Sequence, residues 1–234
     1  MHGHTRTDGP VVEVNKRGPA FMFSYARPSR STSMGPVEKL LGDLNHELGY
    51  YVKGYTEALP GGFDQDMPLG VPWKRKLSRM LAESETLIPL ISRPFLASEW
   101  CGKEWWVFSQ RKVTVRPPLE PGDTAIVPVI WVPVAESEMH PLVRNLQYDN
   151  STMPASYGRH GLLALSRGAA GRPGDYEAAV NRIAKRVGDL LMYATVETGR
   201  MVNLDTAPNA FQKVQPTWEG VRFWHGDHGD PDQV

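Results

Sequence analysis

The chain of 234 residues has only one cysteine, Cys101, so it cannot form an intramolecular disulfide bond. It also has no excess of charge, because 26 Lys and Arg residues balance 26 Asp and Glu residues. A chain without net positive charge lacks the electrostatic footprint of nucleic-acid binding. No apolar run approaches the roughly 20 residues of a membrane helix, and the first ten residues lack the apolar stretch of a secretory signal. We therefore expect a cytoplasmic protein with no nucleic-acid partner and no membrane partner.

The chain does contain enough apolar sequence for one folded α/β domain. Hydrophobic residues make up 41% and charged residues 22%, which excludes global disorder. Short apolar runs bounded by turn residues alternate with stretches of helical period. The predicted strands are residues 19–26, 50–55, 87–91, 125–131 and 161–166. The predicted helices are residues 37–49, a segment that begins at Trp73, a segment that follows Ser98, and residues 175–195. This alternation predicts a mostly parallel sheet with helices on both faces.

The remaining segments are predicted to be loops and tails. Residues 56–72 and 112–123 are loops rich in proline, and residues 133–156 are irregular apart from one turn of helix at 142–146. Residues 1–18 form a polar, flexible N-terminal tail, residues 19–197 the folded domain, and residues 198–234 a loosely packed C-terminal tail. Two prolines conflict with this pattern, because Pro89 and Pro128 lie inside predicted central strands. We expect the hydrogen-bond ladders to be interrupted there or to start late.

The most informative segment is LIPLISRPFLASEWCGKEWWVFSQR, residues 87–111. Its apolar start predicts a buried strand, and Ser98 is a suitable N-cap for the aromatic helix that follows. Trp100 and Glu104 are four residues apart, so both project from one face of that helix. One interpretation is a ligand-binding carboxylate beside an indole, placed after the carboxyl end of a strand. The other is a buried aromatic helix whose glutamate is its solvent-exposed edge.

Three motifs in the same order and spacing resemble those of TIR (Toll/interleukin-1 receptor-like) domains. FMFSYARPS resembles their first strand and loop, FDQDMPLGVPW their BB loop, and SEWCGKEW the signature that begins their third helix. IVPVIWVPV, NLQYDN and YGRHGLLAL are similar to the bacterial FxsC-type branch of this family. The resemblance implies a flavodoxin-like fold with five parallel strands in the order 2-1-3-4-5. The chain departs from the common pattern at Ala26, where relatives often have a polar or charged residue, and in a long insert between the fourth and fifth strands.

Many TIR domains cleave NAD+ at the nicotinamide–ribose bond and release nicotinamide with ADP-ribose or a cyclic form of it. The nicotinamide leaves as a neutral molecule, so the site needs to stabilise an oxocarbenium-like centre rather than supply a general acid. By resemblance Glu104 is the catalytic carboxylate, and Tyr25, Arg27, Trp73 and Trp100 bind the substrate. The resemblance implies NAD+ as substrate, no further cofactor, no metal ion, and self-association with other TIR domains.

The expected topology leads to the same residues by a separate route. In the order 2-1-3-4-5, the ligand crevice lies between the carboxyl ends of the first and third strands. Tyr25 and Arg27 follow the first strand, and Trp100 and Glu104 follow the third. We therefore expect these four side chains to converge on one crevice.

Other functions and simpler structural roles remain open at this point. A non-catalytic TIR scaffold could act through self-association by the long loop at residues 56–72. A flavodoxin-like receiver is weaker, because no acidic cluster follows the first strand and no glycine-rich phosphate loop is present. Trp73 could be simply the first core residue of its helix, and Arg27 and Arg30 could be solvated loop cations. Cys101 suits a small buried thiol better than a nucleophile.

Two further groups of polar residues have simple interpretations. Asp64 and Asp66 lie in a glycine-rich loop, where such residues usually stabilise turns. The histidines of MHGH and WHGDH lie in the predicted tails without partners at a metal-ligand spacing.

Overall fold

The computed structural model describes residues 18–26, 34–53, 55, 61–62, 73–146 and 151–212. From the N-terminus these residues form β1 (Met22–Ser24), α1 (Gly35–Tyr51), α2 (Trp73–Glu83), β2 (Leu87–Ile91), α3 (Arg93–Ala97) and α4 (Glu99–Ser109). They continue with β3 (Val113–Val115), β4 (Val129–Ile130), a 3₁₀ turn η1 (Glu136–Glu138), α5 (Pro141–Arg144), α6 (Ala155–Ser166), α7 (Asp175–Tyr193) and β5 (Ala194–Val196). The predicted N-terminal tail lies outside the described residues except for Gly18.

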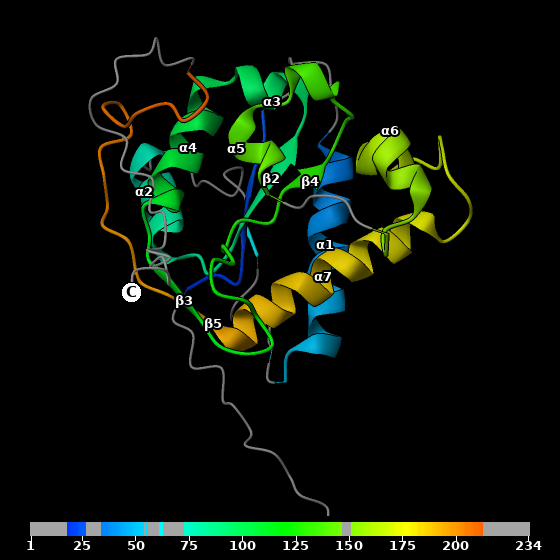
Figure 1. Cartoon of the computed structure of the whole chain (residues 1–234), viewed down its shortest axis with the longest axis horizontal. Helices are drawn as coiled ribbons and strands as arrows, with labels where there is room; N and C mark the ends of the chain where they lie inside the picture. The colour runs from blue at the N-terminus through cyan, green and yellow to red at the C-terminus, as the bar shows by residue number, and fades with distance from the viewer. Residues whose placement is uncertain are drawn as a thin grey trace, which may run out of the picture.

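The centre of the fold is a parallel sheet of three strands in the order β1-β2-β4. Met22 pairs with Leu87 across β1 and β2, and Leu90 pairs with Val129 across β2 and β4. Figure 1 shows α2 and α4 on one side of these strands and α1 and α7 on the other. The predicted class, α/β with a parallel sheet and helices on both faces, is therefore confirmed.

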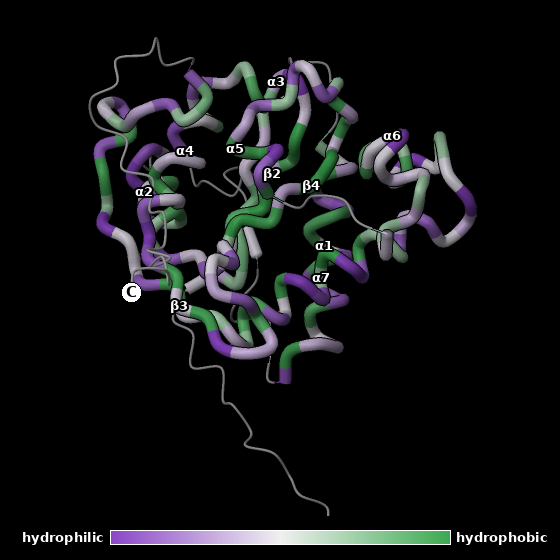
Figure 2. Tube along the Cα trace, in the orientation of Figure 1, coloured by the Kyte–Doolittle hydropathy of each residue, from purple (hydrophilic) through white to green (hydrophobic). Residues whose placement is uncertain are grey.

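Alternation along β1 divides the core into two clusters, because successive side chains of a strand point to opposite faces. Phe21 and Phe23 pack in the cluster of α1 and α7, which we call core 1. Met22 packs with Leu77 of α2 and Trp105 of α4 in core 2. In Figure 2 the central strands are mostly hydrophobic, whereas α2 and α7 alternate between hydrophilic and hydrophobic residues as helices that cover a sheet do.

The strand predicted at residues 50–55 is wrong for the part that the structure describes. α1 continues to Tyr51, with Leu48 and Val52 buried and Tyr50 exposed. Val52 continues the helical stripe of Leu44 and Leu48 at intervals of four, and this period outweighs the β-propensity of the tyrosines. The outer neighbour of β1 is instead Gly62, whose carbonyl accepts a 2.9 Å hydrogen bond from the Phe23 amide.

The strand predicted at residues 161–166 is also wrong, because this segment is the second half of α6. The helix kinks at Gly161, where φ is +75°. Beyond the kink, Leu162 and Leu165 lie three residues apart and are both buried. A short apolar run fits a buried helix as well as a buried strand, and periodicity alone could not distinguish them.

The interruption expected in the strand predicted at residues 125–131 is confirmed at Pro128. A single bridge joins Leu87 to Ile126, and regular pairing resumes only at Val129. Proline has no amide hydrogen for the ladder, which explains why β4 is so short. Pro89, by contrast, lies within the continuous strand β2.

The loop predicted at residues 112–123 contains a strand that the sequence did not reveal. β3 pairs antiparallel with β5, which directly follows α7, in a separate two-stranded sheet. The predicted helices at 37–49, 73 onward, 98 onward, 142–146 and 175–195 correspond to α1, α2, α4, α5 and α7. In the described part of the chain, no helix has both the length and the apolar character needed to cross a bilayer.

The segment that follows Val196 packs against the domain rather than loosely beside it. Residues 199–212, which we call the C-terminal strap, bury Leu204, Ala207 and Phe211 in core 2. The expected loose tail is therefore wrong for this segment, and residues 213–234 lie outside the described part. Figure 1 shows the strap running beside α2 and α4.

Candidate functional site

The candidate carboxylate belongs to Glu104 of α4, and its side chain lies against the carboxyl end of β1. Ser98 caps α4 as predicted, since its hydroxyl accepts a hydrogen bond from the Cys101 amide at 3.3 Å. The Glu104 side chain is not a solvent-exposed edge, because the residue is only 8% exposed. Its Oε2 accepts a hydrogen bond from the hydroxyl of Ser24, the last residue of β1. Burial and this contact fix the carboxylate at the carboxyl end of the parallel sheet.

The two tryptophans predicted to bind the substrate, Trp73 of α2 and Trp100 of α4, are in contact. The ring centroids of Trp73 and Trp100 are 4.9 Å apart with an edge-on angle of 65° between the planes. Trp73 is 41% exposed, so it is not a buried core residue. Two lysines lie over these rings, with Lys74 Nζ 5.6 Å and Lys103 Nζ 5.0 Å from the Trp100 centroid. The result is an aromatic surface with positive charge at its border.

The expected convergence of four side chains on one crevice is only partly found. Ser24 and Tyr25 are consecutive, and their side chains go to opposite faces of the sheet. Ser24 meets Glu104, whereas Tyr25 packs against core 1 on the side of α1 and α7. Arg27 and Arg30 lie outside the described residues, as do Asp64 and Asp66 and most of the 56–72 loop.

Sequence reasoning missed Ser24 and the C-terminal strap. A single serine in the apolar run PAFMFSYA was a usable signal, because a buried hydroxyl needs a hydrogen-bond partner. For the strap the signal was Gly102, a glycine inside a helix, which often marks a close approach of another backbone. The Gly102 carbonyl accepts a hydrogen bond from the Ala210 amide at 3.1 Å.

The strap is also held to the helices by polar contacts around Asp205. Its carboxylate pairs with Lys74 at 2.5 Å, and its carbonyl accepts a 3.2 Å hydrogen bond from Lys103. Lys103 is almost fully buried and also pairs with Glu99 at 2.7 Å. The same two lysines therefore border the tryptophan pair and anchor the strap.

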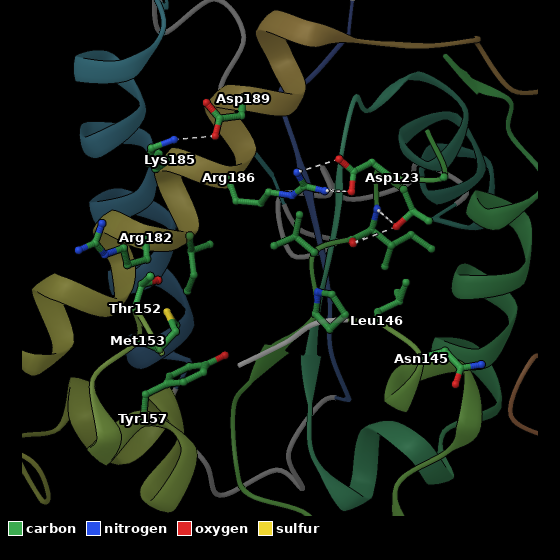
Figure 3. A pocket seen from close by; sticks show the side chains of 16 residues that line it. Asp123, Asn145, Leu146, Thr152, Met153, Tyr157, Arg182, Lys185, Arg186 and Asp189 are labelled. Atoms are coloured by element: carbon green, nitrogen blue, oxygen red, sulfur yellow. Dashed lines mark hydrogen bonds and ion pairs between the residues drawn. The ribbon is translucent and has the colours of Figure 1, made fainter. Parts of the chain in front are cut away.

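Two cavities lie outside this cluster. One has a volume of about 420 Å³ and lies at the carboxyl ends of β1, β2 and β4, where Tyr25 forms part of its wall. The other, of about 590 Å³, lies between α7 and the start of β4. Figure 3 shows Arg186 reaching from α7 to Asp123, with which it makes hydrogen bonds of 3.0 and 3.4 Å.

The described residues contain no group of three or more His, Cys, Asp or Glu side chains that could hold a metal ion. Cys101 is buried at 2% exposure, as expected of a small core thiol. No protein-family model matches the chain, and no curated protein matches it either.

Proposed function

We propose that this protein is a TIR-type NAD+ nucleosidase in which Glu104 is the catalytic carboxylate. The observation that carries the proposal is the position of Glu104, buried at the carboxyl end of a parallel sheet and oriented by the Ser24 hydroxyl. Ligands of open α/β folds bind at this edge of the sheet. A carboxylate held there is already oriented before substrate arrives, which is what electrostatic stabilisation of a transition state requires.

The reaction breaks the bond between the nicotinamide nitrogen and the ribose carbon. The bonding electrons stay with the pyridinium nitrogen, so nicotinamide leaves as a neutral molecule. The negative charge of Glu104 stabilises the oxocarbenium-like ribose, and water then attacks to give ADP-ribose, or an internal nucleophile gives a cyclic product. Trp73 and Trp100 offer the aromatic surface on which a nicotinamide or adenine ring can stack. Arg27 remains a proposed substrate contact from the resemblance, whereas Tyr25, which the resemblance also assigned to the substrate, lies on the other face of β1 from Glu104.

The proposal includes the flavodoxin-like order 2-1-3-4-5 as the finer description of the fold. The parallel sheet β1-β2-β4 with Gly62 bridged to the outer side of β1 supports the first four positions of this order. In this description Gly62 lies in the second strand, and α6 occupies the segment expected to form the fifth. We propose that the protein works in the cytoplasm and assembles with other TIR domains.

The test is nicotinamide release from NAD+, measured by chromatography at low and high protein concentration and with a crowding agent. Glu104→Gln keeps the size and a hydrogen-bond acceptor for Ser24 but removes the charge. We expect it to lower the rate roughly 100-fold or more, as the loss of one electrostatic stabiliser does. Glu99→Gln is the control, since Glu99 is an exposed acid of the same helix and should leave the rate near that of the unmodified protein. An active Glu104→Gln variant would refute the assignment.

A non-catalytic TIR scaffold is the second candidate, and the exposure of Trp73 favours it. An exposed indole beside a second indole is the kind of anchor that protein interfaces use. Absence of nicotinamide release under every assembly condition, together with loss of self-association in Trp73→Ala, would support the scaffold and contradict the enzyme.

A further inference from the structure

The smaller cavity is formed where the three parallel strands end. Its wall contains Tyr25 and Ala26 after β1, Ser92 after β2 and Trp131 after β4. α6 closes it with Leu163 and Arg167. Its volume of about 420 Å³ lies in the range of small-molecule sites, roughly 300–1,000 Å³. A cavity at the carboxyl ends of parallel strands is where α/β folds bind ligands.

The walls of this cavity suit a flat, apolar ring. Tyr25 and Trp131 are both half-buried and both pack against core 1, so their rings are held by neighbours. Met34, Val37 and Leu163 supply aliphatic contacts between them. Aromatic side chains that are already ordered give stacking surface at little further entropic cost.

The charge at the rim of the cavity has one sign. Arg93 and Arg167 line it, and no carboxylate is among its described lining residues. Arg93 is engaged by Glu138, with nitrogen–oxygen distances of 2.7 and 2.8 Å. Within the described part of the chain, the Arg167 guanidinium makes no hydrogen bond or ion pair. Arg167 is therefore available to an anionic group.

The larger cavity also contains basic residues, and two of them are paired with carboxylates. Arg186 is paired with Asp123, and Lys185 is paired with Asp189 at 2.8 Å, as the dashed lines in Figure 3 mark. Carboxylates of the protein itself compensate these two cations, whereas Arg182, which also lines this cavity, makes no hydrogen bond or ion pair within the described part of the chain.

The two cavities differ in their walls. The larger one has a single aromatic residue among its described lining residues, Tyr157, whose hydroxyl already accepts a hydrogen bond from the Ile130 amide. Tyr25 and Trp131, by contrast, both line the smaller one beside Arg167.

We propose that the smaller cavity binds a small molecule that carries an aromatic ring and an anionic group. The ring lies against Tyr25 and Trp131, and the phosphate or carboxylate is bound by Arg167. The site is distinct from that of Glu104, because Tyr25 and Ser24 point to opposite faces of β1. It does not depend on NAD+ cleavage, and its binding can be measured whether or not the protein is an enzyme.

The test is calorimetric titration of the full chain with four probes that separate the two parts of the ligand. AMP has a ring and a phosphate, indole-3-acetate a ring and a carboxylate, adenosine a ring alone, and ribose 5-phosphate an anion alone. We expect at least one of the first two to bind roughly tenfold or more tightly than both of the others, since adenosine lacks the charge-assisted hydrogen bond with Arg167 and ribose 5-phosphate lacks the ring that stacks on Tyr25 and Trp131. Which of the two binds identifies the anionic group as phosphate or carboxylate.

Variants locate the binding. Arg167→Gln should reduce the affinity for the preferred probe roughly tenfold, to the level of adenosine. Arg159→Gln is the matched control, because Arg159 is an exposed arginine of the same helix that does not line the cavity. Arg167 is itself exposed, so its replacement should leave the fold intact, which a thermal melt checks.

Three outcomes would overturn the proposal. The first is no binding of AMP or indole-3-acetate at millimolar concentration. The second is equal binding by Arg167→Gln and the unmodified chain. The third is loss of binding in Glu104→Gln, since this would assign the anion to the other face of β1.

Discussion

The C-terminal strap leads to a sharp prediction at Gly102. A Cβ atom added there would lie 1.7 Å from Oδ1 and 2.7 Å from Cγ of Asn209, and 3.3 Å from Cδ2 of Phe211. Real Cβ atoms do not approach other atoms this closely, so Gly102→Ala must move the Asn209 side chain and break the 2.9 Å hydrogen bond that its Oδ1 accepts from the Phe211 amide. We expect this to displace residues 209–211 from α4. In an open helix position the same substitution would be favourable, because alanine is the better helix former.

The magnitude follows from the contacts that the displacement breaks. Alanine gains about 1 kcal/mol in helix propensity. Against this, the hydrogen bond from Ala210 to Gly102 contributes about 1 kcal/mol, and burial of the Phe211 side chain about 1.5–3 kcal/mol. The balance is a loss of about 2 kcal/mol in the free energy of unfolding. Helix propensity alone predicts the opposite effect, a more stable protein.

The assay is urea unfolding of the full chain followed by tryptophan fluorescence. Gly42→Ala is the control, because Gly42 lies inside α1 with no atom within 4 Å of an added Cβ. We expect it to stabilise the protein by about 0.5–1 kcal/mol. In an Asn209→Ala background the clashing atoms are absent, so Gly102→Ala should cost less than half as much. If Gly102→Ala stabilises the protein as Gly42→Ala does, the strap does not lie on α4 and the reasoning fails.

Two further predictions concern the other face of the sheet. Gly161→Ala should destabilise by about 2–4 kcal/mol in the same urea assay, because φ is +75° there and an added Cβ would lie 2.6 Å from the Trp131 carbonyl oxygen; a neutral result would contradict the kink in α6. Burial alone would raise the pKa of Asp123, but the hydrogen bond with the Glu120 amide and the pairing with Arg186 outweigh it and lower the pKa. A carboxyl group whose pKa is lowered by folding stabilises the folded state at pH values above its unfolded-state pKa of about 3.9. This stabilisation is lost as the pH falls through the folded-state pKa. Asp123→Asn should therefore cost about 1 kcal/mol or less at pH 7, and the difference in thermal melts should shrink as the pH falls below the unfolded pKa of about 3.9; a cost independent of pH would show that the charge is not its source.

The local sequence predicted the elements whose pattern has one interpretation. The strand at Leu87–Ile91 was predicted with its observed bounds, since its two isoleucines favour a strand and Pro89 in its middle disfavours a helix. The helix starts at Trp73 and after Ser98 were also found, and the serine cap of the second helix is a chemical signal that does not depend on distant contacts. The sequence likewise predicted the interrupted ladder at Pro128 from the missing amide hydrogen.

The failures arose where the pattern was ambiguous or the partner was distant. Tyr50 and Tyr51 have strand propensity, yet the periodicity of the residues around them extends α1. β3 was missed because a strand of three residues is defined by β5, about 80 residues later, and nothing local indicates this pairing. In the candidate site the resemblance assigned Trp73 and Trp100 to the substrate, but their direct ring contact was not predicted. Tyr25 was expected beside Glu104 and lies on the other face, because the alternation of side chains along β1 was not applied to it.

The burial of Glu104 has a common cause with the packing of the strap. A helix that is apolar on nearly all sides must be covered on more than one side. α4 is such a helix, since every residue from Cys101 to Trp105 is buried, including both charged ones. The sheet covers one side through Ser24, and the strap covers another through Gly102 and Asp205. The apolar composition of SEWCGKEWWVFS therefore required a second covering segment. With both sides of the helix covered, the glutamate lies inside the protein rather than at a solvent-exposed edge. Displacing the strap by Gly102→Ala should consequently alter the surroundings of Glu104 as well as the stability, and nicotinamide release by that variant tests the two together.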